Sequence, residues 1–478
     1  MFVSQNFFDS ETLPPVIIVG SGPAGMTLGC SLLEKKIPCL ILEAGDRDYE
    51  SDIQDDYIGE TSGDIYHSLD ITRLRQFGGS SNHWSGWCRP LDAWDFDPVP
   101  SLGIPGWPIR KSDLDPYSAK ANEILEIPSP IDQRVSDSIF ESRFVRSPPV
   151  RFGEKYEGLV RTSKYLNVAL RTAVTAMYAE DGRIVSLEFV DSSGSVRRIS
   201  PKFVVLACGG IENSRLLLWS NFVSSQRVVA QPGSLGRYWM EHPHEVVGRV
   251  SLSRLIHQRQ LPSDLFSVSV TADRLVKHGA LNASIRLPYP RDLGLKQRIR
   301  KGFCELDPEL LELVSSTFGT TARCTDQPLK AVWEQAPDFG NRVALSETSR
   351  DSFGKPRSHL IWRKTAQDYR TARVAFELVA THIVRTGAGV VWAAPHLIKL
   401  GEYPEDGEIG GHHHMGGTRM SNSAEHGVVD ANLKIHGTSN GYVAGSSVFV
   451  RGGHANPTYT IVQLSLRLSD HLATKLSS

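Results

Sequence analysis

Hydrophobic positions near the start of the chain follow a strand, helix, strand pattern. Residues 15–19 form a β-branched run without polar alternation, which is typical of a parallel strand buried on both faces. The run ends at Gly20, and the spacing then predicts an amphipathic helix over 24–35 and a second strand over 38–43. The pattern therefore predicts a βαβ unit at the start of a doubly wound α/β domain.

Strand patterns recur in two later regions. The first region predicts a β-meander that returns to the main sheet, with strands at 168–178, 184–190 and 203–207. The second, between about 245 and 410, alternates like an antiparallel sheet, with candidate strands at 266–270, 280–287, 342–345 and 359–362. Since no repeat or low-complexity linker separates the two regions, the second domain is predicted to be inserted into the first.

One long helix interrupts the second region. Thr365 and Asp368 have the spacing of a capping box and predict its start, and Gly387 predicts its end. The apolar spacing predicts that the buried face consists of Val374, Leu378, Val379, His382 and Ile383.

Composition narrows the choice of partners. The 478 residues include 52 Lys and Arg and 53 Asp and Glu, so the formal net charge is −1. This charge gives no electrostatic reason to expect binding to nucleic acid or to an anionic membrane. Six cysteines without a C-x-x-C motif indicate neither zinc nor a disulfide scaffold, and we expect a reducing, cytoplasmic setting. We expect neither an export signal before Val16 nor a membrane span, since no apolar run approaches eighteen residues.

The first glycine-rich turn carries a dinucleotide-binding fingerprint. Gly20, Gly22 and Gly25 follow a predicted buried strand and open a helix, and Glu43 ends the next strand, 18 residues after Gly25. Gly22 lets the backbone approach a pyrophosphate at the helix N-terminus, and Glu43 can accept hydrogen bonds from ribose hydroxyls. The alternative interpretation is a glycine-rich turn with a surface glutamate.

Two further segments favour FAD over NAD. Residues 75–86 contain paired glycines followed by small hydroxyl residues, which allows backbone to lie against a flat ring system, although a tight loop would have the same composition. Near the C-terminus, Asn456 is a good N-cap and Pro457 a good first residue for a helix over 459–472. The positive end of that helix would suit the charge on a reduced flavin, whereas a bare helix start would have no such meaning.

Three adjacent histidines, His412 to His414, precede the segment Met415 to Met420. We predict no metal site here, because consecutive side chains diverge and no carboxylate or cysteine spacing completes a ligand set. A packed, hydrogen-bonded histidine and a catalytic base remain as alternatives, and the base is favoured.

The order of these segments resembles the glucose-methanol-choline (GMC) flavoprotein oxidoreductases. The resemblance also includes Arg342-Val-Ala-Leu, Leu360-Ile-Trp, Gly427-Val-Val-Asp430 and Tyr442-Val-Ala-Gly445. The Gly-Gly-x-Ser-x-His-Trp arrangement and the asparagine at 456 are most similar to the pyranose oxidase and fructose or gluconate dehydrogenase branches. The chain is shorter than most of those relatives.

The resemblance implies FAD and the residues that hold it. These residues are Gly20, Gly22, Gly25, Glu43, Arg75, Gly78, Gly79, Ser80, Ser81, Asn82, His83, Trp84, Val174, Gly445, Asn456, Pro457 and Thr458. His83 occupies the place where pyranose oxidases attach FAD through the flavin 8α-methyl group. Asn82 replaces the threonine expected before it, so covalent and dissociable FAD both remain open.

The resemblance also implies a reaction. Counting back six residues from Arg419 places the catalytic histidine at His413, and aligning the Gly-Thr pair instead places it at His414. His413 is expected to take the hydroxyl proton of an alcohol on a sugar, glycoside or polyol, while Asn456 hydrogen-bonds the oxygen and flavin N5 accepts hydride. The electron acceptor is oxygen, a quinone or a separate redox protein. The alternatives are a lyase of the same family and a flavin-binding electron-transfer or scaffold subunit.

We predict a discontinuous FAD-binding domain from residues 1–100, 165–245 and 415–478, and a substrate-binding α+β domain from 246–414, with 101–164 as the connecting segment. The basic stretch 291–301 is predicted to be a solvated helix face, with a patch for a partner protein or acidic substrate as the alternative.

Overall fold

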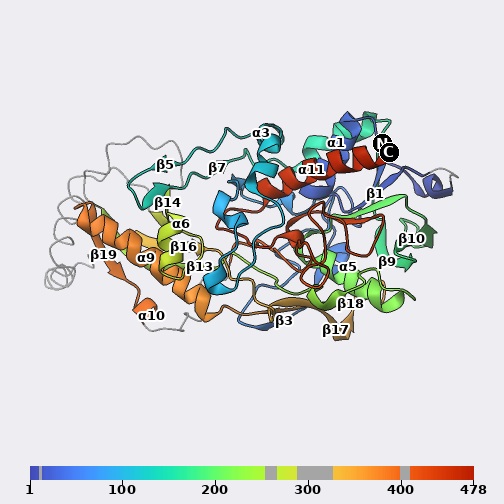
Figure 1. The fold of residues 1–478 in the computed structure, drawn as a ribbon. Helices are drawn as coiled ribbons and strands as arrows, with labels where there is room; N and C mark the ends of the chain where they lie inside the picture. Colours follow the sequence, from blue (N-terminus) through green and yellow to red (C-terminus); the bar gives the residue numbers. More distant parts are fainter. Residues whose placement is uncertain (10–12, 253–265, 288–326, 399–409, 478) are drawn as a thin grey trace, which may run out of the picture.

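The computed structural model describes residues 1–9, 13–252, 266–287, 327–398 and 410–477, coloured along the sequence in Figure 1. The cofactor domain is built on a five-stranded parallel sheet with the order β20-β12-β1-β2-β8. Its strands are β1 (Val16–Val19), β2 (Cys39–Leu42), β8 (Leu166–Ala169), β12 (Phe203–Leu206) and β20 (Gly441–Val443). The predicted βαβ unit and Rossmann-type sheet are confirmed.

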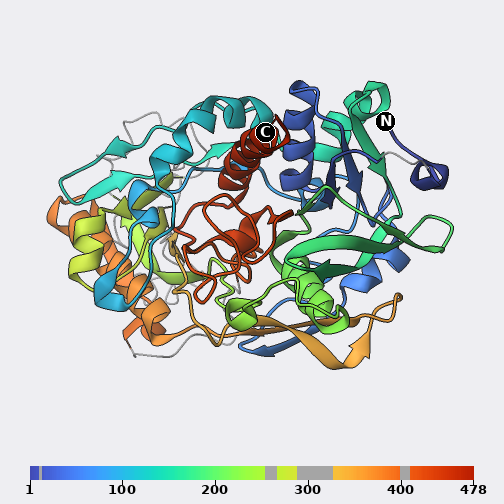
Figure 2. The same ribbon diagram turned by 45° about the vertical axis from the view of Figure 1, so that its right-hand side comes forward.

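Three helices accompany this parallel sheet: the first packs on it, the last helix of the chain packs on the first, and the middle one packs on the strands at 173–180 and 342–350. They are α1 (Pro23–Glu34), α5 (Gly209–Val223) and α11 (Thr458–Ser477). Strands β1 and β2 are buried along their whole length, which explains their continuous apolar sequence. Figures 1 and 2 both show α11, the last helix of the chain, lying against α1, the first, so the two ends of the sequence build one core.

The predicted meander is present, with one strand divided. Residues 168–178 do not form a single strand, because Arg171 has a left-handed φ of 47° and turns the chain between sheets. The residues before it join the parallel sheet as β8, and those after it pair in an antiparallel sheet. That sheet consists of β9 (Ala173–Glu180), β10 (Arg183–Val190) and β11 (Val196–Ile199).

A seven-stranded antiparallel sheet forms the second half of the molecule, with the order β19-β13-β16-β15-β14-β6-β5. Its strands are β5 (Gln133–Arg134), β6 (Ile139–Glu141), β13 (His244–Leu252), β14 (Phe266–Val270), β15 (Ala283–Leu287), β16 (Gln327–Trp333) and β19 (Gly389–Ala393). The sheet takes β5 and β6 from the segment 101–164. Helix α9 (Ala366–Arg385) covers it, and a short helix, α6 (Ala272–Lys277), lies beside α9 in Figure 1.

Helix α9 begins as predicted, but its buried face differs from the predicted one. Thr365 accepts the Asp368 N–H and Asp368 accepts the Thr365 N–H, so the capping box is confirmed, and Gly387 follows the helix with φ 66°. The buried residues are Asp368, Tyr369, Thr371, Ala372, Ala375, Phe376, Val379 and Ile383. Val374, Leu378 and His382 are only half-buried, because the sheet packs against the small residues of the adjacent stripe.

A correction concerns the candidate strands at 342–345 and 359–362. They belong to a separate three-stranded sheet of β17 (Arg342–Arg350), β18 (Pro356–Trp362) and β3 (Glu60–Gly63). Strand β18 pairs in parallel with β3, which lies about 300 residues earlier in the chain. This sheet runs along the lower edge of Figure 1 between the two large sheets.

Shorter elements connect these units. They are α2 (Ser51–Gln54), α3 (Ser118–Leu125), α4 (Phe152–Thr162), α10 (Pro395–Ile398) and the strand pair β4 (Trp87–Cys88) and β7 (Val145–Arg146).

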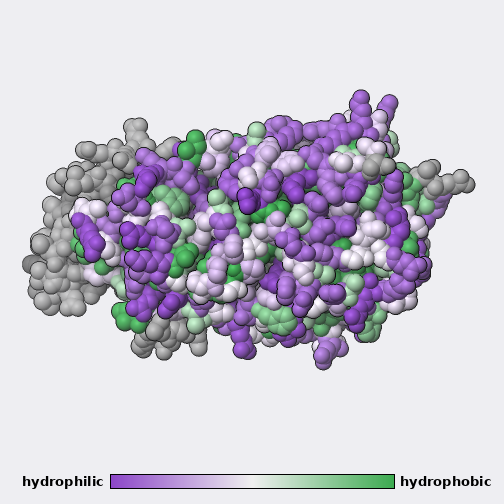
Figure 3. Space-filling model, in the orientation of Figure 1, coloured by the Kyte–Doolittle hydropathy of each residue, from purple (hydrophilic) through white to green (hydrophobic). Residues whose placement is uncertain are grey.

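The face of the molecule in Figure 3 is mainly hydrophilic, with small and scattered hydrophobic patches. The basic stretch 291–301 lies outside the described residues. None of the described helices combines the length and the apolar character needed to cross a membrane.

Candidate active site

A cavity of about 490 Å³ opens at the carboxyl ends of the parallel strands. Gly20 follows β1, Glu43 follows β2, Ala207 follows β12 and Gly445 lies two residues after β20, and all four line the cavity. In open α/β sheets this edge is where ligands bind. The sequence therefore places its glycine-rich turns at the position where the topology creates a crevice.

Three helices point their N-termini at this cavity. Pro23 begins α1, Gly209 begins α5 and Thr458 begins α11, and each of these residues lines the cavity. Free N–H groups and the helix dipole make such ends favourable for negative charge. The cavity is therefore suited to a pyrophosphate and to a ring that becomes anionic on reduction.

The fingerprint glycines have different structural roles. A Cβ on Gly22 would meet no atom within 4 Å, so this backbone is open to the cavity. A Cβ on Gly25 would lie 1.9 Å from the carbonyl oxygen of Gly20, so Gly25 is needed for the close packing of α1 on the turn. Gly20 has φ 99°, which favours glycine at the turn itself.

Glu43 lines the cavity with a carboxylate that already has partners. One oxygen accepts the Gly45 N–H at 2.7 Å, and the other accepts the Ser21 N–H at 2.8 Å and the Ser21 hydroxyl at 2.6 Å. A carboxylate has about four acceptor positions, so roughly one remains. A ribose with two hydroxyls would therefore compete with the Ser21 hydroxyl.

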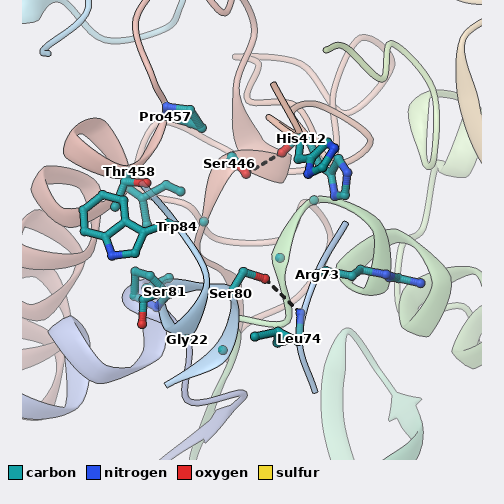
Figure 4. A pocket seen from close by; sticks show the side chains of 18 of the residues that line it. Gly22, Arg73, Leu74, Ser80, Ser81, Trp84, His412, Ser446, Pro457 and Thr458 are labelled. Atoms are coloured by element: carbon teal, nitrogen blue, oxygen red, sulfur yellow. Dashed lines mark hydrogen bonds between the residues drawn. The ribbon is translucent and has the colours of Figure 1, made fainter. Parts of the chain in front are cut away.

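The second glycine-rich segment forms one wall of the cavity. Gly79, Ser80, Ser81, His83 and Trp84 all line it. The Ser80 hydroxyl accepts the Leu74 N–H at 3.1 Å and holds the segment beside the loop that precedes it. Figure 4 shows Trp84 and Thr458 together on one side of the pocket and His412 on the other.

Five predicted cofactor residues do not line the cavity. Arg75 is buried in an ion pair with Asp56, and Asn82 donates to the Phe77 carbonyl. Gly78 has φ 90° and its N–H donates to the Ser21 hydroxyl, while the Val174 carbonyl accepts the amine of Lys355. These four residues, together with Gly25, support the walls around the cavity.

The last helix begins one residue later than predicted. It starts at Thr458, and the Ile461 N–H donates to the Pro457 carbonyl, so Pro457 and not Asn456 occupies the capping position. Pro457 is compatible with this position because it brings no N–H that needs a partner, although its ring offers no acceptor to the first turn of the helix. Asn456 lines the cavity, and its side chain has no hydrogen-bond partner among the described residues.

All three histidines line the cavity but lie in different surroundings. His412 is exposed, has a left-handed φ of 59° and packs edge-on against His67. His414 is buried beside Tyr66 and Trp239, and its Nε2 has no partner in the described part of the chain. Burial lowers the pKa of His414 well below its usual value.

His413 has the most defined contacts of the three. Its Nδ1 lies 2.8 Å from Nδ1 of His242, and its backbone N–H donates to Glu241 at 2.6 Å. Burial, with the neighbouring His242, His244 and Arg286, holds the pKa of His413 well below its ordinary value. The ring is therefore neutral at pH 7 and can accept a proton.

Glu241 is fully buried and connects this loop to the rest of the site. One oxygen accepts the His242 and His413 N–H groups, and the other accepts the Tyr66 hydroxyl at 2.5 Å. Burial raises the pKa of Glu241 to about 7, although its hydrogen bonds act in the opposite direction.

Sequence reasoning did not find Glu241, His242 or Tyr66. The run Glu241-His-Pro-His-Glu245 is a dense group of titratable residues, and that was the available signal. It also missed the N-terminus of α5, where Gly209 and Gly210 follow the predicted strand at 203–207 after one residue, Cys208. Within the described residues, no group of three His, Cys, Asp or Glu side chains has the arrangement of a metal site.

The parallel sheet, the fingerprint loop and the convergent helix ends are the features of an α/β protein with a dinucleotide-type crevice at the edge of its sheet. Comparisons with known proteins agree with this class. Residues 337–465 match the family described as GMC oxidoreductase. Over this segment the chain is similar to the GMC oxidoreductases, a family that implies FAD as the cofactor.

Individual relatives are distant. The fructose dehydrogenase large subunit of Gluconobacter japonicus is 24% identical over 337 residues, which cover 69% of this chain and 58% of that subunit. C-glycoside 3-oxidase of Microbacterium trichothecenolyticum is 24% identical over 84% of this chain and 76% of its own. The crystal structure of pyridoxine 4-oxidase from Mesorbium loti has a TM-score of 0.59 at 16% identity, covering 96% of this chain and 99% of that one, and shows the shared fold.

Proposed function

We propose that the protein oxidises an alcohol group of a sugar, glycoside, polyol or similar small molecule to a carbonyl, with His413 as the base. The observation that carries the proposal is one continuous cavity that is lined by the dinucleotide fingerprint, by His413 and by Asn456. Relatives named for fructose and for C-glycosides support the substrate class.

FAD fits the residues of the cavity. Gly22, Glu43 and the N-terminus of α1 would hold the adenosine and pyrophosphate end, and Gly79 to Trp84 with the N-terminus of α11 would hold the ring end. When bound, FAD supplies the acceptor for the hydride of the carbinol carbon.

The chain's own residues handle the proton. Neutral His413 accepts the hydroxyl proton at Nε2, which has no hydrogen-bond partner in the described structure and is not enclosed. The amide of Asn456, free of any capping duty, donates a hydrogen bond to the alcohol oxygen as negative charge develops there. We favour His413 over His414 because only the ring of His413 has a hydrogen-bond partner that orients it.

Anaerobic mixing with a panel of sugars, glycosides and simple alcohols tests the proposal. At least one alcohol should bleach the flavin absorbance of the FAD-loaded protein, and no bleaching by any alcohol would favour a lyase or a scaffold role instead. Admission of air then identifies the acceptor. Rapid recolouring indicates oxygen, and slow recolouring indicates a quinone or a separate redox protein.

We place any covalent attachment of FAD at His83. This ring lines the cavity, and desolvation together with Arg151 lowers its pKa, so it presents a neutral nitrogen. Acid precipitation decides the point. A covalent flavin stays in the pellet, and a dissociable one colours the supernatant.

A further inference from the structure

His242 lies against the histidine loop and was not part of the predicted site. It precedes β13, and its side chain is fully buried. Nδ1 of its ring is 2.8 Å from Nδ1 of His413, and Nε2 is 3.2 Å from the carbonyl oxygen of Gly452. The ring therefore joins the proposed base to the loop that leads into Asn456.

These two contacts determine where the protons of the pair lie. A carbonyl oxygen only accepts, so the contact with Gly452 requires the proton of His242 to be on Nε2. Burial lowers the pKa of His242 to about 3, so its ring is neutral at pH 7 and carries a single N–H. Nδ1 of His242 is then a lone pair, and the bond between the two Nδ1 atoms needs His413 as its donor.

We propose that His242 is a positioning residue that holds His413 in the tautomer protonated at Nδ1, which leaves the lone pair on Nε2 to take the substrate proton. The inference rests on the proposed function, because the tautomer matters only if His413 is the base. The opposite assignment would set the Nε2 lone pair of His242 against the Gly452 oxygen at 3.2 Å, which is repulsive.

The proton transfer balances without any change in His242. The alcohol O–H bond breaks, and its proton forms a bond to Nε2 of His413. The ring becomes an imidazolium whose Nδ1–H still donates to His242. The positive charge is stabilised by that bond, since hydrogen bonds from charged donors are about twice as strong as neutral ones.

Two substitutions separate the two contacts of His242. Asparagine places an amide oxygen near the position of Nδ1, so His242→Asn retains an acceptor for His413 and loses the bond to Gly452. Glutamine places its amide near the position of Nε2, so His242→Gln retains the donor to Gly452 and loses the acceptor. Asparagine is the smaller of the two and leaves the larger gap, so a role limited to packing would affect His242→Asn more, which is the reverse of the order that the proposal predicts.

The kinetic experiment measures anaerobic flavin reduction in FAD-loaded wild type, His242→Asn, His242→Gln and His413→Ala. We expect His242→Gln to slow reduction about 10- to 100-fold at saturating alcohol, the usual effect of losing a partner that orients a ring, with little change in the alcohol concentration at half-saturation. His242→Asn should be affected much less. Equal rates in His242→Gln and wild type would overturn the inference.

A second readout does not depend on activity. In protein labelled with ¹⁵N at histidine, the ring nitrogen shifts report which nitrogen carries the proton, and the signals lost in His413→Ala and His242→Gln identify the pair. We expect the proton of His413 on Nδ1 in wild type and in His242→Asn. A proton on Nε2 of His413 in wild type would overturn the inference even if His242→Gln fails to fold. Full activity of His413→Ala would instead contradict the proposed base, whichever tautomer the spectra show.

Discussion

Replacing Gly22 with alanine should separate FAD binding from folding. Gly22 has φ −65° and ψ −176°, which alanine adopts without strain, and its new Cβ would meet no protein atom within 4 Å. We therefore expect the free energy of unfolding without FAD to change by no more than about 0.5 kcal/mol, or to rise slightly because alanine restricts the unfolded chain.

The same methyl group would occupy the space where a pyrophosphate approaches the backbone. Forcing an extra methyl into a fitted contact costs about 1–3 kcal/mol. This corresponds to a Kd for FAD that is roughly 5- to 150-fold weaker. The loss arises only in the complex, because the free protein has room for the methyl.

Titration of the apoprotein with FAD, followed by flavin fluorescence, measures the Kd, and thermal melting without FAD measures the fold. Gly25→Ala is the matched control within the same fingerprint. Its Cβ would lie 1.9 Å from the Gly20 carbonyl oxygen, so this variant should lower the Tm before any FAD is added. Wild-type affinity for FAD in Gly22→Ala would refute the placement of the pyrophosphate at this turn.

Three further predictions concern the histidine loop and its neighbours. His413→Ala should keep the flavin spectrum, and its rate of alcohol-dependent bleaching should fall by about 10²- to 10⁴-fold. His414→Ala should lose less of this rate. The reverse order in anaerobic stopped-flow traces would move the base to His414. Since the pKa of His413 is well below 6.5, the acid limb of the wild-type rate profile should also lie below that pH. Asn456→Asp should slow flavin reduction strongly, because a carboxylate repels the developing alkoxide. The Tm should not fall, because the side chain of Asn456 caps no helix. An unchanged rate of flavin reduction would leave Asn456 with no part in the reaction. The pKa of Glu241 is about 7 in the folded protein, against an ordinary value of 4.5 in the unfolded chain. The contribution of Glu241 to the free energy of unfolding is therefore present below pH 4.5 and is lost as the pH rises through 7. Glu241→Gln stays neutral and should gain about 3 kcal/mol relative to wild type over that range, whereas parallel melting curves at pH 5 and pH 8 would contradict the raised pKa.

Local pattern predicted the parts of the fold that depend on near neighbours. The βαβ unit was readable because a doubly buried strand needs a continuous apolar run and the following turn needs glycine. The capping box of Thr365 and Asp368 was readable because both hydrogen bonds close within four residues. The buried face of α9 was not readable from the sequence, because it depends on which side chains the sheet leaves room for.

Contacts between distant segments were decided by the tertiary structure alone. Strand β3 joins β18, and His242 meets His413 across 171 residues, and no periodicity reports such a pairing. The sequence by itself identified the residue types of the site, since a dinucleotide turn and a histidine run have local signatures. Only folding brought Glu241 and His242 behind that run, because a buried carboxylate or imidazole is recognised by its partners, and those partners are set by packing between the sheets.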